Sequence, residues 1–196
     1  MNTSLLHRKE SVIITAIEII DDLGLQGLTT REIAKRQSIS EGTLFRHFKN
    51  KAEIMLAILD NFSKYDSDIM ETIKSRKLKP KEAIVYFVDA YALYYENYPA
   101  ITAILHIYDS LIYDKQLKDK VKSIIDTRTS FISRIIDEGK AEGYIKSEVD
   151  TENLGYIIFG IIRSVSLKWR METYIFSLRE RILSAVNMVL NNFEIK

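Results

Sequence analysis

Residues 28–51, LTTREIAKRQSISEGTLFRHFKNK, contain the starts of several helices close together. Thr29 and Glu32 have the spacing of a capping box, in which the threonine side chain accepts a hydrogen bond from the backbone of the third helical residue. Leu28 and Ile33 stand on either side of Thr29 at the spacing of a hydrophobic staple. The sequence therefore predicts a short helix that begins at Thr29.

Two more helix starts follow in the same stretch. The polar pair Gln37–Ser38 marks a turn, after which Ser40 caps a second helix and Asn50 caps a third. Two short helices joined by a turn of three or four residues form a helix-turn-helix. The second helix opens with Gly42 and Thr43, whose small side chains let a backbone approach the base edges in a major groove. The stretch therefore predicts a DNA-binding element.

This stretch resembles the DNA-binding domain of the TetR family of transcriptional regulators. The residues that match the family pattern are Thr29, Thr30, Ile33, Ala34, Ile39, Ser40, Gly42, Thr43, Leu44, His47, Phe48 and Lys51. Ser38 stands where the family usually has a turn glycine, and serine adopts the left-handed conformation at some cost. Phe45 stands where a tyrosine usually donates its hydroxyl to a phosphate. For Phe45, packing against other helices and contact with the groove remain equal alternatives.

The resemblance implies base contacts by Arg31 and Thr43, and phosphate contacts by Thr30, His47 and Lys51. Lys51 also stands at the start of a helix, where free amide groups attract a phosphate. The predicted DNA-binding residues are Thr30, Arg31, Ser40, Glu41, Gly42, Thr43, Phe45, Arg46, His47 and Lys51. Taken singly, a threonine here is a cap and His47 a surface histidine, and only the joint pattern indicates DNA binding.

Outside this stretch the apolar residues also follow a helical period, and nothing in the second half predicts a strand. Residues 1–8 are expected to form a loose arm, which is either a frayed terminus or a contact with DNA. Further helices are expected at residues 9–23, 50–74, 80–98, 99–107, 117–143, 150–171 and 177–192. The predicted fold is therefore all-α, with about nine helices. Residues 1–51 form a helix-turn-helix domain, residues 52–196 a ligand-sensing and dimerisation domain, and the helix at residues 50–74 links them.

Composition restricts the function further. Apolar residues make up 46% of the chain, as in a globular protein, and the net charge of +1 gives little general attraction for nucleic acid. The chain has no cysteine, its three histidines lie far apart, and neither a metal site nor a cofactor is predicted. No nucleophile stands beside a base, so an enzyme is not expected. Since no membrane span or signal peptide is apparent, we expect a cytoplasmic protein.

The last two helices carry apolar residues over a wide arc, and such helices need more than one partner. We therefore predict a dimer interface made of Ile158, Ile162, Val165, Trp169, Ile182, Val186 and Val189. The alternative is an ordinary monomer core. Gly155, Gly160 and Ser164 permit close approach of helices. Dimerisation also follows from DNA geometry, since two recognition helices must meet half-sites that lie about 34 Å apart.

Tyrosines and two arginines on other helices suggest a ligand site. The candidates are Tyr91, Tyr94, Tyr95, His106, Arg128 and Arg163. A tyrosine stripe is also compatible with simple packing, and an arginine on an apolar helix with an ion pair. An amphiphile with an acidic head and an apolar body suits such a site.

These features, together with the resemblance, predict a homodimeric repressor that binds a palindromic operator in double-stranded DNA. A small apolar or amphiphilic ligand in the second domain releases it, a step that rests on the resemblance alone. The alternative is a helix-turn-helix dimer that binds DNA or a protein partner without any small-molecule ligand.

Overall fold

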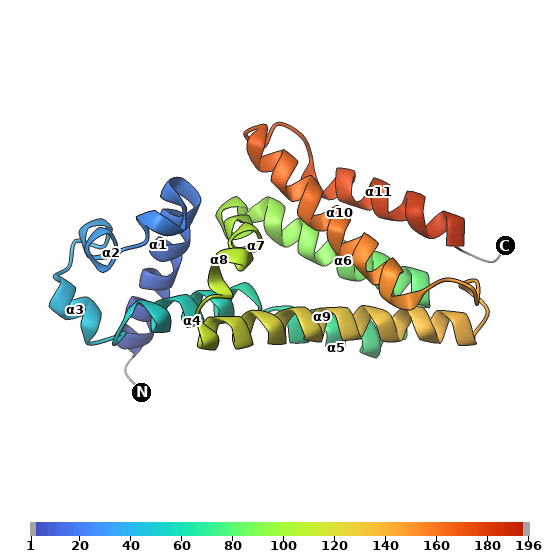
Figure 1. Cartoon of the computed structure of the whole chain (residues 1–196), viewed down its shortest axis with the longest axis horizontal. Coiled ribbons are helices and arrows are strands. Elements are labelled where there is room, and N and C mark those ends of the chain that lie inside the picture. Colours follow the sequence, from blue (N-terminus) through green and yellow to red (C-terminus); the bar gives the residue numbers. More distant parts are fainter. Residues whose placement is uncertain (1–2, 194–196) are drawn as a thin grey trace. The chain divides into compact units, whose positions relative to one another are not determined.

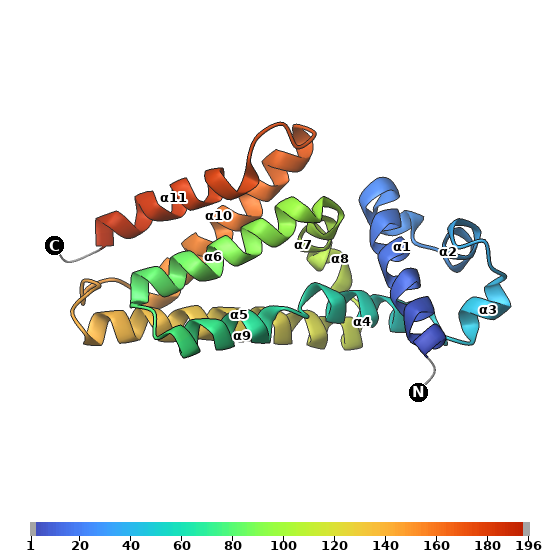
Figure 2. The same ribbon diagram turned by 180° about the vertical axis from the view of Figure 1, so that it is seen from behind.

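The structure is a computed structural model that describes residues 3–193, with side chains from Arg8 onward. Every regular element among these residues is a helix, which confirms the all-α fold (Figures 1 and 2). The chain divides into two compact units. Unit 1 runs to Lys64 and includes Pro99–Ile124, and unit 2 comprises Tyr65–Tyr98 and the residues from Ile125 on.

Unit 1 contains the predicted helix-turn-helix. Its first four helices are α1 (Thr3–Gly27), α2 (Thr30–Arg36), α3 (Glu41–Phe45) and α4 (Lys51–Phe62), and α1 packs against both α2 and α4. The core between them is completed by Ile17, Leu28 and Leu44, each 0% exposed. Removing such side chains from water is the main force that holds short helices in place.

The N-terminal arm expected at residues 1–8 is largely helical instead. α1 begins at Thr3, so Thr3–Arg8 extend the helix, while Met1 and Asn2 lie outside the described residues. The segment contains neither glycine nor proline, and leucine and arginine favour helices. At the other end, Gly24 has a non-helical conformation with φ of 70°, where the sequence predicted the helix to stop.

Residues from the middle of the chain complete unit 1. The short helices η1 (Pro99–Thr102) and α7 (Ala103–His106) pack against α1, and α8 (Tyr108–Leu111) follows them. The rings of Tyr108 and Phe62 meet edge to face with centroids 6.0 Å apart. Lys120, near the start of α9 (Lys115–Ala141), forms an ion pair of 2.5 Å with Asp60 of α4. The predicted helix at residues 99–107 is therefore divided into two shorter pieces, η1 and α7, which pack against α1.

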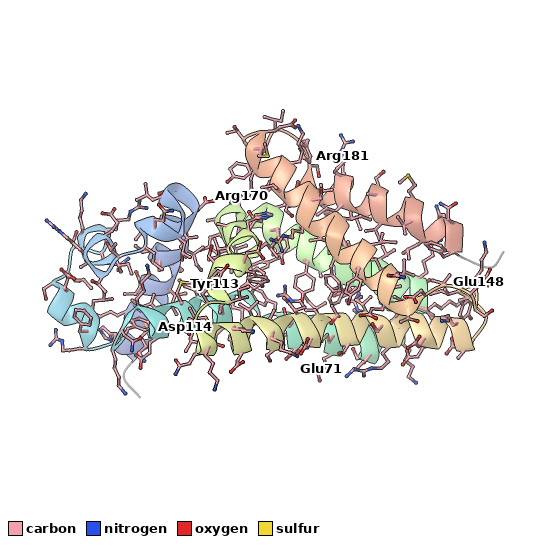
Figure 3. All side chains as sticks on the ribbon, in the orientation of Figure 1. Glu71, Tyr113, Asp114, Glu148, Arg170 and Arg181 are labelled. Atoms are coloured by element: carbon pink, nitrogen blue, oxygen red, sulfur yellow. The ribbon has the colours of Figure 1, made fainter. Side chains whose placement is uncertain are left out.

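Unit 2 contains α5 (Asp66–Arg76), α6 (Pro80–Asn97), the remainder of α9, α10 (Thr151–Met171) and α11 (Leu178–Phe193). α6 packs against α5 and α11, and α10 packs against α11. The buried ring of Phe87 on α6 also lies near Phe131 of α9 and Phe159 of α10. Charged side chains such as Glu71 and Arg181 point away from this core (Figure 3). None of the helices among the described residues has the length and apolar content to cross a bilayer.

The single helix expected at residues 50–74 is wrong, because a turn at residues 63–65 separates α4 from α5. At this turn the Ser63 hydroxyl donates a hydrogen bond of 3.0 Å to the Leu59 carbonyl. Serine side chains compete for backbone groups in this way and favour helix ends. Asp66, the first residue of α5, is only 7% exposed. Apolar residues keep a helical period on both sides of the turn, so the pattern concealed the break.

The residues predicted for a dimer interface lie mostly in the core of unit 2. Ile158, Ile162, Trp169, Ile182 and Val186 are 0–5% exposed within a single chain. Val165 and Val189 are half-buried. Side chains that are already covered have little surface left for a second chain, so the first five are corrected to core residues. The apolar arc on these helices is wide because it covers the core and also continues onto the surface.

Candidate nucleic-acid interface and ligand site

The turn between α2 and α3 has the geometry that the sequence predicted for a glycine position. Ser38 has φ of 53°, in the left-handed region. The Ile39 amide donates to the Ala34 carbonyl over 3.0 Å, which satisfies a carbonyl at the end of α2. This is how helices commonly end when a left-handed residue follows them.

Gln37 fixes α2 against α1, a role that sequence analysis missed. Its Nε2 donates to the Thr15 hydroxyl over 2.5 Å, and its Oε1 accepts from the Ser11 hydroxyl over 2.9 Å. Thr15 is 6% exposed, so its hydroxyl depends on this partner. The available signal was the pair of polar residues Ser11 and Thr15, which lie four apart on α1.

α3 is a five-residue helix with a nearly bare outer face. Ser40 caps it by accepting a hydrogen bond of 3.1 Å from the Thr43 amide, as predicted, and Leu44 is its only buried residue. Gly42 is exposed, and a Cβ added there has no neighbour closer than the Ser40 hydroxyl at 3.8 Å. Phe45 is 47% exposed, so its ring lies at the surface rather than in the core.

Polar side chains around α3 bond to one another. Arg46 donates to the Thr43 hydroxyl over 3.1 Å. The Thr30 hydroxyl, at the start of α2, donates to the Glu41 carboxylate over 2.6 Å. Arg31 is exposed on α2 and His47 is half-buried. The predicted DNA-binding residues of α2 and α3 thus lie on neighbouring helices of one unit, with their polar groups accessible.

The start of α4 is closed by two hydrogen bonds between side chains and the backbone. Asn50 accepts from the Glu53 amide over 2.9 Å, and the Glu53 carboxylate accepts from the Lys49 amide over 2.7 Å. Lys51 is exposed in the first turn. The capping box predicted at Thr29 is formed in one direction, with Thr29 accepting from the Glu32 amide over 3.1 Å, while the Glu32 carboxylate accepts from Arg36.

In unit 2, Arg128 is held by a partner that the sequence did not indicate. Its Nε and Nη2 each donate to Asp66 over 2.8 Å, a bidentate ion pair in which the arginine is 6% and the aspartate 7% exposed. Tyr91 donates to the same carboxylate over 2.6 Å, and its ring centroid lies 4.5 Å from the guanidinium carbon. Burial raises the pKa of Tyr91 well above its usual value, so this hydroxyl keeps its proton.

The tyrosines next to this pair form a continuous aromatic cluster. Tyr94 and Tyr95 have ring centroids 5.8 Å apart, and Tyr95 lies 6.1 Å from Tyr91. Tyr95 is 1% exposed. The Tyr94 hydroxyl is buried and has no hydrogen-bond partner among the residues that the structure describes. Burial also raises the pKa of Tyr94, so the neutral hydroxyl is available to a polar group of a ligand.

The six candidate ligand residues do not form one group. Tyr91, Tyr94, Tyr95 and Arg128 converge in unit 2, whereas His106 belongs to unit 1 and Arg163 is exposed on α10. Arg128 is held in a buried ion pair with Asp66.

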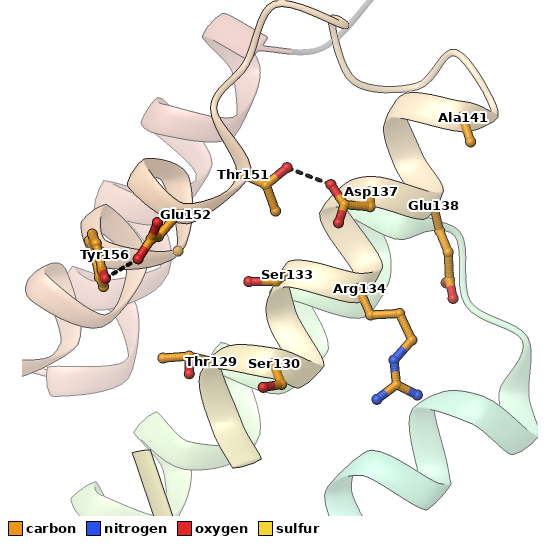
Figure 4. Close-up of a pocket in the computed structure, with 11 residues that line it drawn as sticks. Thr129, Ser130, Ser133, Arg134, Asp137, Glu138, Ala141, Thr151, Glu152 and Tyr156 are labelled. Carbon is orange, nitrogen blue, oxygen red and sulfur yellow. Dashed lines mark hydrogen bonds between the residues drawn. The ribbon is translucent and has the colours of Figure 1, made fainter. Parts of the chain in front are cut away.

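An open cleft of about 770 Å³ between α9 and α10 contains none of the six candidates. Its wall includes Arg134, Asp137, Glu138 and Glu152, of which Asp137 accepts from Thr151 and Glu152 from Tyr156 (Figure 4). The residues that line it include three carboxylates and one arginine, besides hydroxyl groups and apolar side-chain atoms.

Comparison with known proteins gives matches along nearly the whole chain. Residues 12–58 match the family described as "Bacterial regulatory proteins, tetR family", and residues 59–192 match "YsiA-like protein, C-terminal region". The chain is 26% identical over 162 residues to the fatty acid metabolism regulator protein of Bacillus subtilis (strain 168), a match that covers 82% of each protein.

Solved structures share the fold. The regulator FadR from Bacillus subtilis in complex with stearoyl-CoA has a TM-score of 0.78 and 22% identity, covering 94% of this chain and 99% of that one. FadR from Thermus thermophilus in complex with lauroyl-CoA has a TM-score of 0.61 and 18% identity, covering 96% of each chain. With the helix-turn-helix geometry and both regional matches, this chain belongs to the TetR family of DNA-binding transcriptional regulators.

Proposed function

We propose that this regulator acts as a homodimeric repressor on a palindromic operator and that an amphiphile of the acyl-CoA class releases it. The bare start of α3 carries the DNA-binding part of the proposal. Gly42 is exposed and Lys51 stands at the nearby start of α4, an arrangement suited to base edges and a phosphate respectively. The ligand class is suggested by the relatives, one named for fatty acid metabolism and two solved with acyl-CoA.

The aromatic cluster of unit 2 supports a ligand of this kind. Tyr91, Tyr94 and Tyr95 offer apolar rings, and the Tyr94 hydroxyl has no partner among the described residues. Ligand sites combine apolar walls with a few polar groups that orient the ligand. Tyr91 and Tyr95 are 3% and 1% exposed, so an acyl chain must displace packed side chains to reach these rings, and its polar thioester would then lie near the Tyr94 hydroxyl.

The ion pair between Asp66 and Arg128 provides a route to the DNA-binding helices. Asp66 is the first residue of α5, and only three residues connect it to α4, whose opposite end carries Lys51. A ligand that shifts α5 would therefore act only three residues along the chain from the end of α4. Because linkage is reciprocal, DNA must weaken ligand binding by the same factor as the ligand weakens DNA binding.

The exposed side of α10 supports dimerisation. Tyr156, Ile157, Leu167 and Met171 are 42–74% exposed at helical spacing, and Gly160 lies between them with open space around its Cβ position. A second chain that covers this stripe with its own α10 and α11 forms a four-helix bundle. Such an arrangement fits the twofold symmetry of a palindromic site.

The test measures DNA binding by fluorescence anisotropy, with a duplex selected by the protein from a random pool. We expect lauroyl-CoA and stearoyl-CoA to weaken binding at least tenfold, while coenzyme A alone, at the same concentration, has no effect. A nonionic detergent controls for nonspecific amphiphile effects. DNA binding that survives every acyl-CoA tested favours the alternative, a helix-turn-helix dimer that needs no ligand.

A further inference from the structure

Glu41 places a negative charge on the DNA-facing side of α3. It is the first residue of the helix, it is exposed, and it stands beside Gly42. Its hydrogen-bond partner is the Thr30 hydroxyl at 2.6 Å, and no cation among the described residues pairs with it. Phosphates repel a carboxylate, so Glu41 opposes general affinity for DNA. Its contribution must therefore be sought in selectivity.

The hydrogen bond from Thr30 also changes what Thr30 offers to DNA. A threonine hydroxyl has one hydrogen, and here it is given to Glu41 Oε2. Phosphate oxygens only accept hydrogen bonds, so this hydroxyl has nothing to donate to them while it holds Glu41. The phosphate contact that the family resemblance implied for Thr30 is thus in conflict with this geometry. Thr30 is better described as a residue that positions Glu41.

We propose that Glu41 determines operator specificity by accepting a hydrogen bond from the exocyclic amino group of a cytosine in the major groove, and that Thr30 positions its carboxylate. This inference rests on the proposed function. Thr30 occupies Oε2, which leaves Oε1 for a base. A side chain fixed before binding loses less conformational entropy when the complex forms.

The chemistry of the base edges favours cytosine. A carboxylate accepts hydrogen bonds only, so the acceptors of guanine and the carbonyl of thymine repel it. Adenine presents an amino group beside the N7 acceptor, whereas the hydrogen-bonding group of cytosine in the major groove is a single amino donor. Glu41 therefore favours cytosine, then adenine, and disfavours the other two bases.

The experiment selects bound duplexes from a random pool with the full-length protein and four variants: Glu41→Ala, Glu41→Gln, Thr30→Val and Thr30→Ser. For the wild type we expect cytosine at one symmetric position in each half-site, preferred about 5- to 150-fold over guanine or thymine. Glu41→Ala loses the preference at that position alone. Glu41→Gln changes it to adenine, which glutamine binds through two hydrogen bonds.

The threonine variants test positioning. Thr30→Val has nearly the same shape but no hydroxyl, and we expect it to weaken the cytosine preference while the other positions of the site stay unchanged. Thr30→Ser, which keeps the hydroxyl, restores the preference. Circular dichroism checks that each variant is folded.

Three results contradict the proposal, and they are distinguishable. If Glu41→Ala selects the same sequence as the wild type at every position, Glu41 reads no base, although the proposed repressor function stands. If Thr30→Val keeps the full preference, Thr30 does not position Glu41. If the wild type itself selects no sequence from the pool, the proposed function fails together with the inference.

Discussion

α3 and α10 present two different kinds of surface. α3 has five residues and one buried side chain, Leu44, so a cap and a single anchor hold it and its outer face has no packing role. α10 has 21 residues and buries six of them, yet it still leaves Leu167 and Met171 exposed. On α3, exposure follows from small and polar residues. On α10, apolar residues occur on both sides, and only packing distinguishes core from surface.

The largest effect is expected from two substitutions on α10, Ile162→Asp and Leu167→Asp. Ile162 is 5% and Leu167 46% exposed. Ile162→Asp buries an unpaired charge and should lower the free energy of unfolding by about 5 kcal/mol. Leu167→Asp should keep the helical circular dichroism signal but change the dimer to a monomer in sedimentation. A Leu167→Asp variant that remains a dimer would remove this stripe from the interface.

The second prediction concerns the buried ion pair of unit 2. Arg128→Met leaves the Asp66 carboxylate buried without its cation, and we expect the free energy of unfolding to fall by about 3 kcal/mol. The double variant Asp66→Leu with Arg128→Met should recover most of this loss, since an apolar pair of similar volume replaces the charges. Urea denaturation measures both. If the single and double variants lose the same free energy of unfolding, the cost of Arg128→Met does not come from leaving the Asp66 charge unpaired.

The third prediction concerns the contact between α1 and α2. Gln37→Ala removes the partner of the buried Thr15 hydroxyl and should lower the free energy of unfolding by about 1–2 kcal/mol. Gln26→Ala, at an exposed position of α1, is the matched control and should change it by less than about 0.5 kcal/mol. If the two variants unfold at the same urea concentration, Gln37 does not hold α2 in place.

The smallest effect is expected at the turn before α3. Ser38→Gly relieves a left-handed conformation and should raise the free energy of unfolding by about 0.5–1 kcal/mol. Lys35→Gly, in the helical part of α2, should lower it by about 1 kcal/mol. Thermal denaturation measures both changes. A Ser38→Gly variant that is less stable than the wild type would mean that the serine makes a compensating contact.

These contrasts explain which parts of the molecule were predictable. Caps join residues three apart, so Ser40 and Asn50 marked helix starts in the sequence, and the positive φ of Ser38 followed from a local turn. Asp66 and Arg128 are 62 residues apart, and Gln37 and Thr15 are 22 apart. A local pattern can mark one polar residue of such a pair, but it does not identify the distant partner.

Five of the seven predicted dimer residues lie in the core instead, for a related reason. Helical periodicity identifies the apolar side of α10, but it does not indicate how much of that side other helices of the same chain cover. Ile157 and Ile158 are neighbours in sequence and have the same side chain, yet the first is 42% and the second 0% exposed. The exposed face of α3 was predictable because its residues are small or polar, and none of them is needed to fill the core.

The central claim is that the outer face of α3 meets DNA, and Gly42→Leu tests it most directly. Gly42 is exposed, and among the described residues the nearest atom to an added Cβ is the Ser40 hydroxyl at 3.8 Å. We expect unchanged or slightly higher thermal stability and at least a tenfold loss of affinity for the selected duplex, whereas Glu18→Leu, on the exposed side of α1, keeps full affinity. A Gly42→Leu protein that binds this duplex as tightly as the wild type would contradict the account.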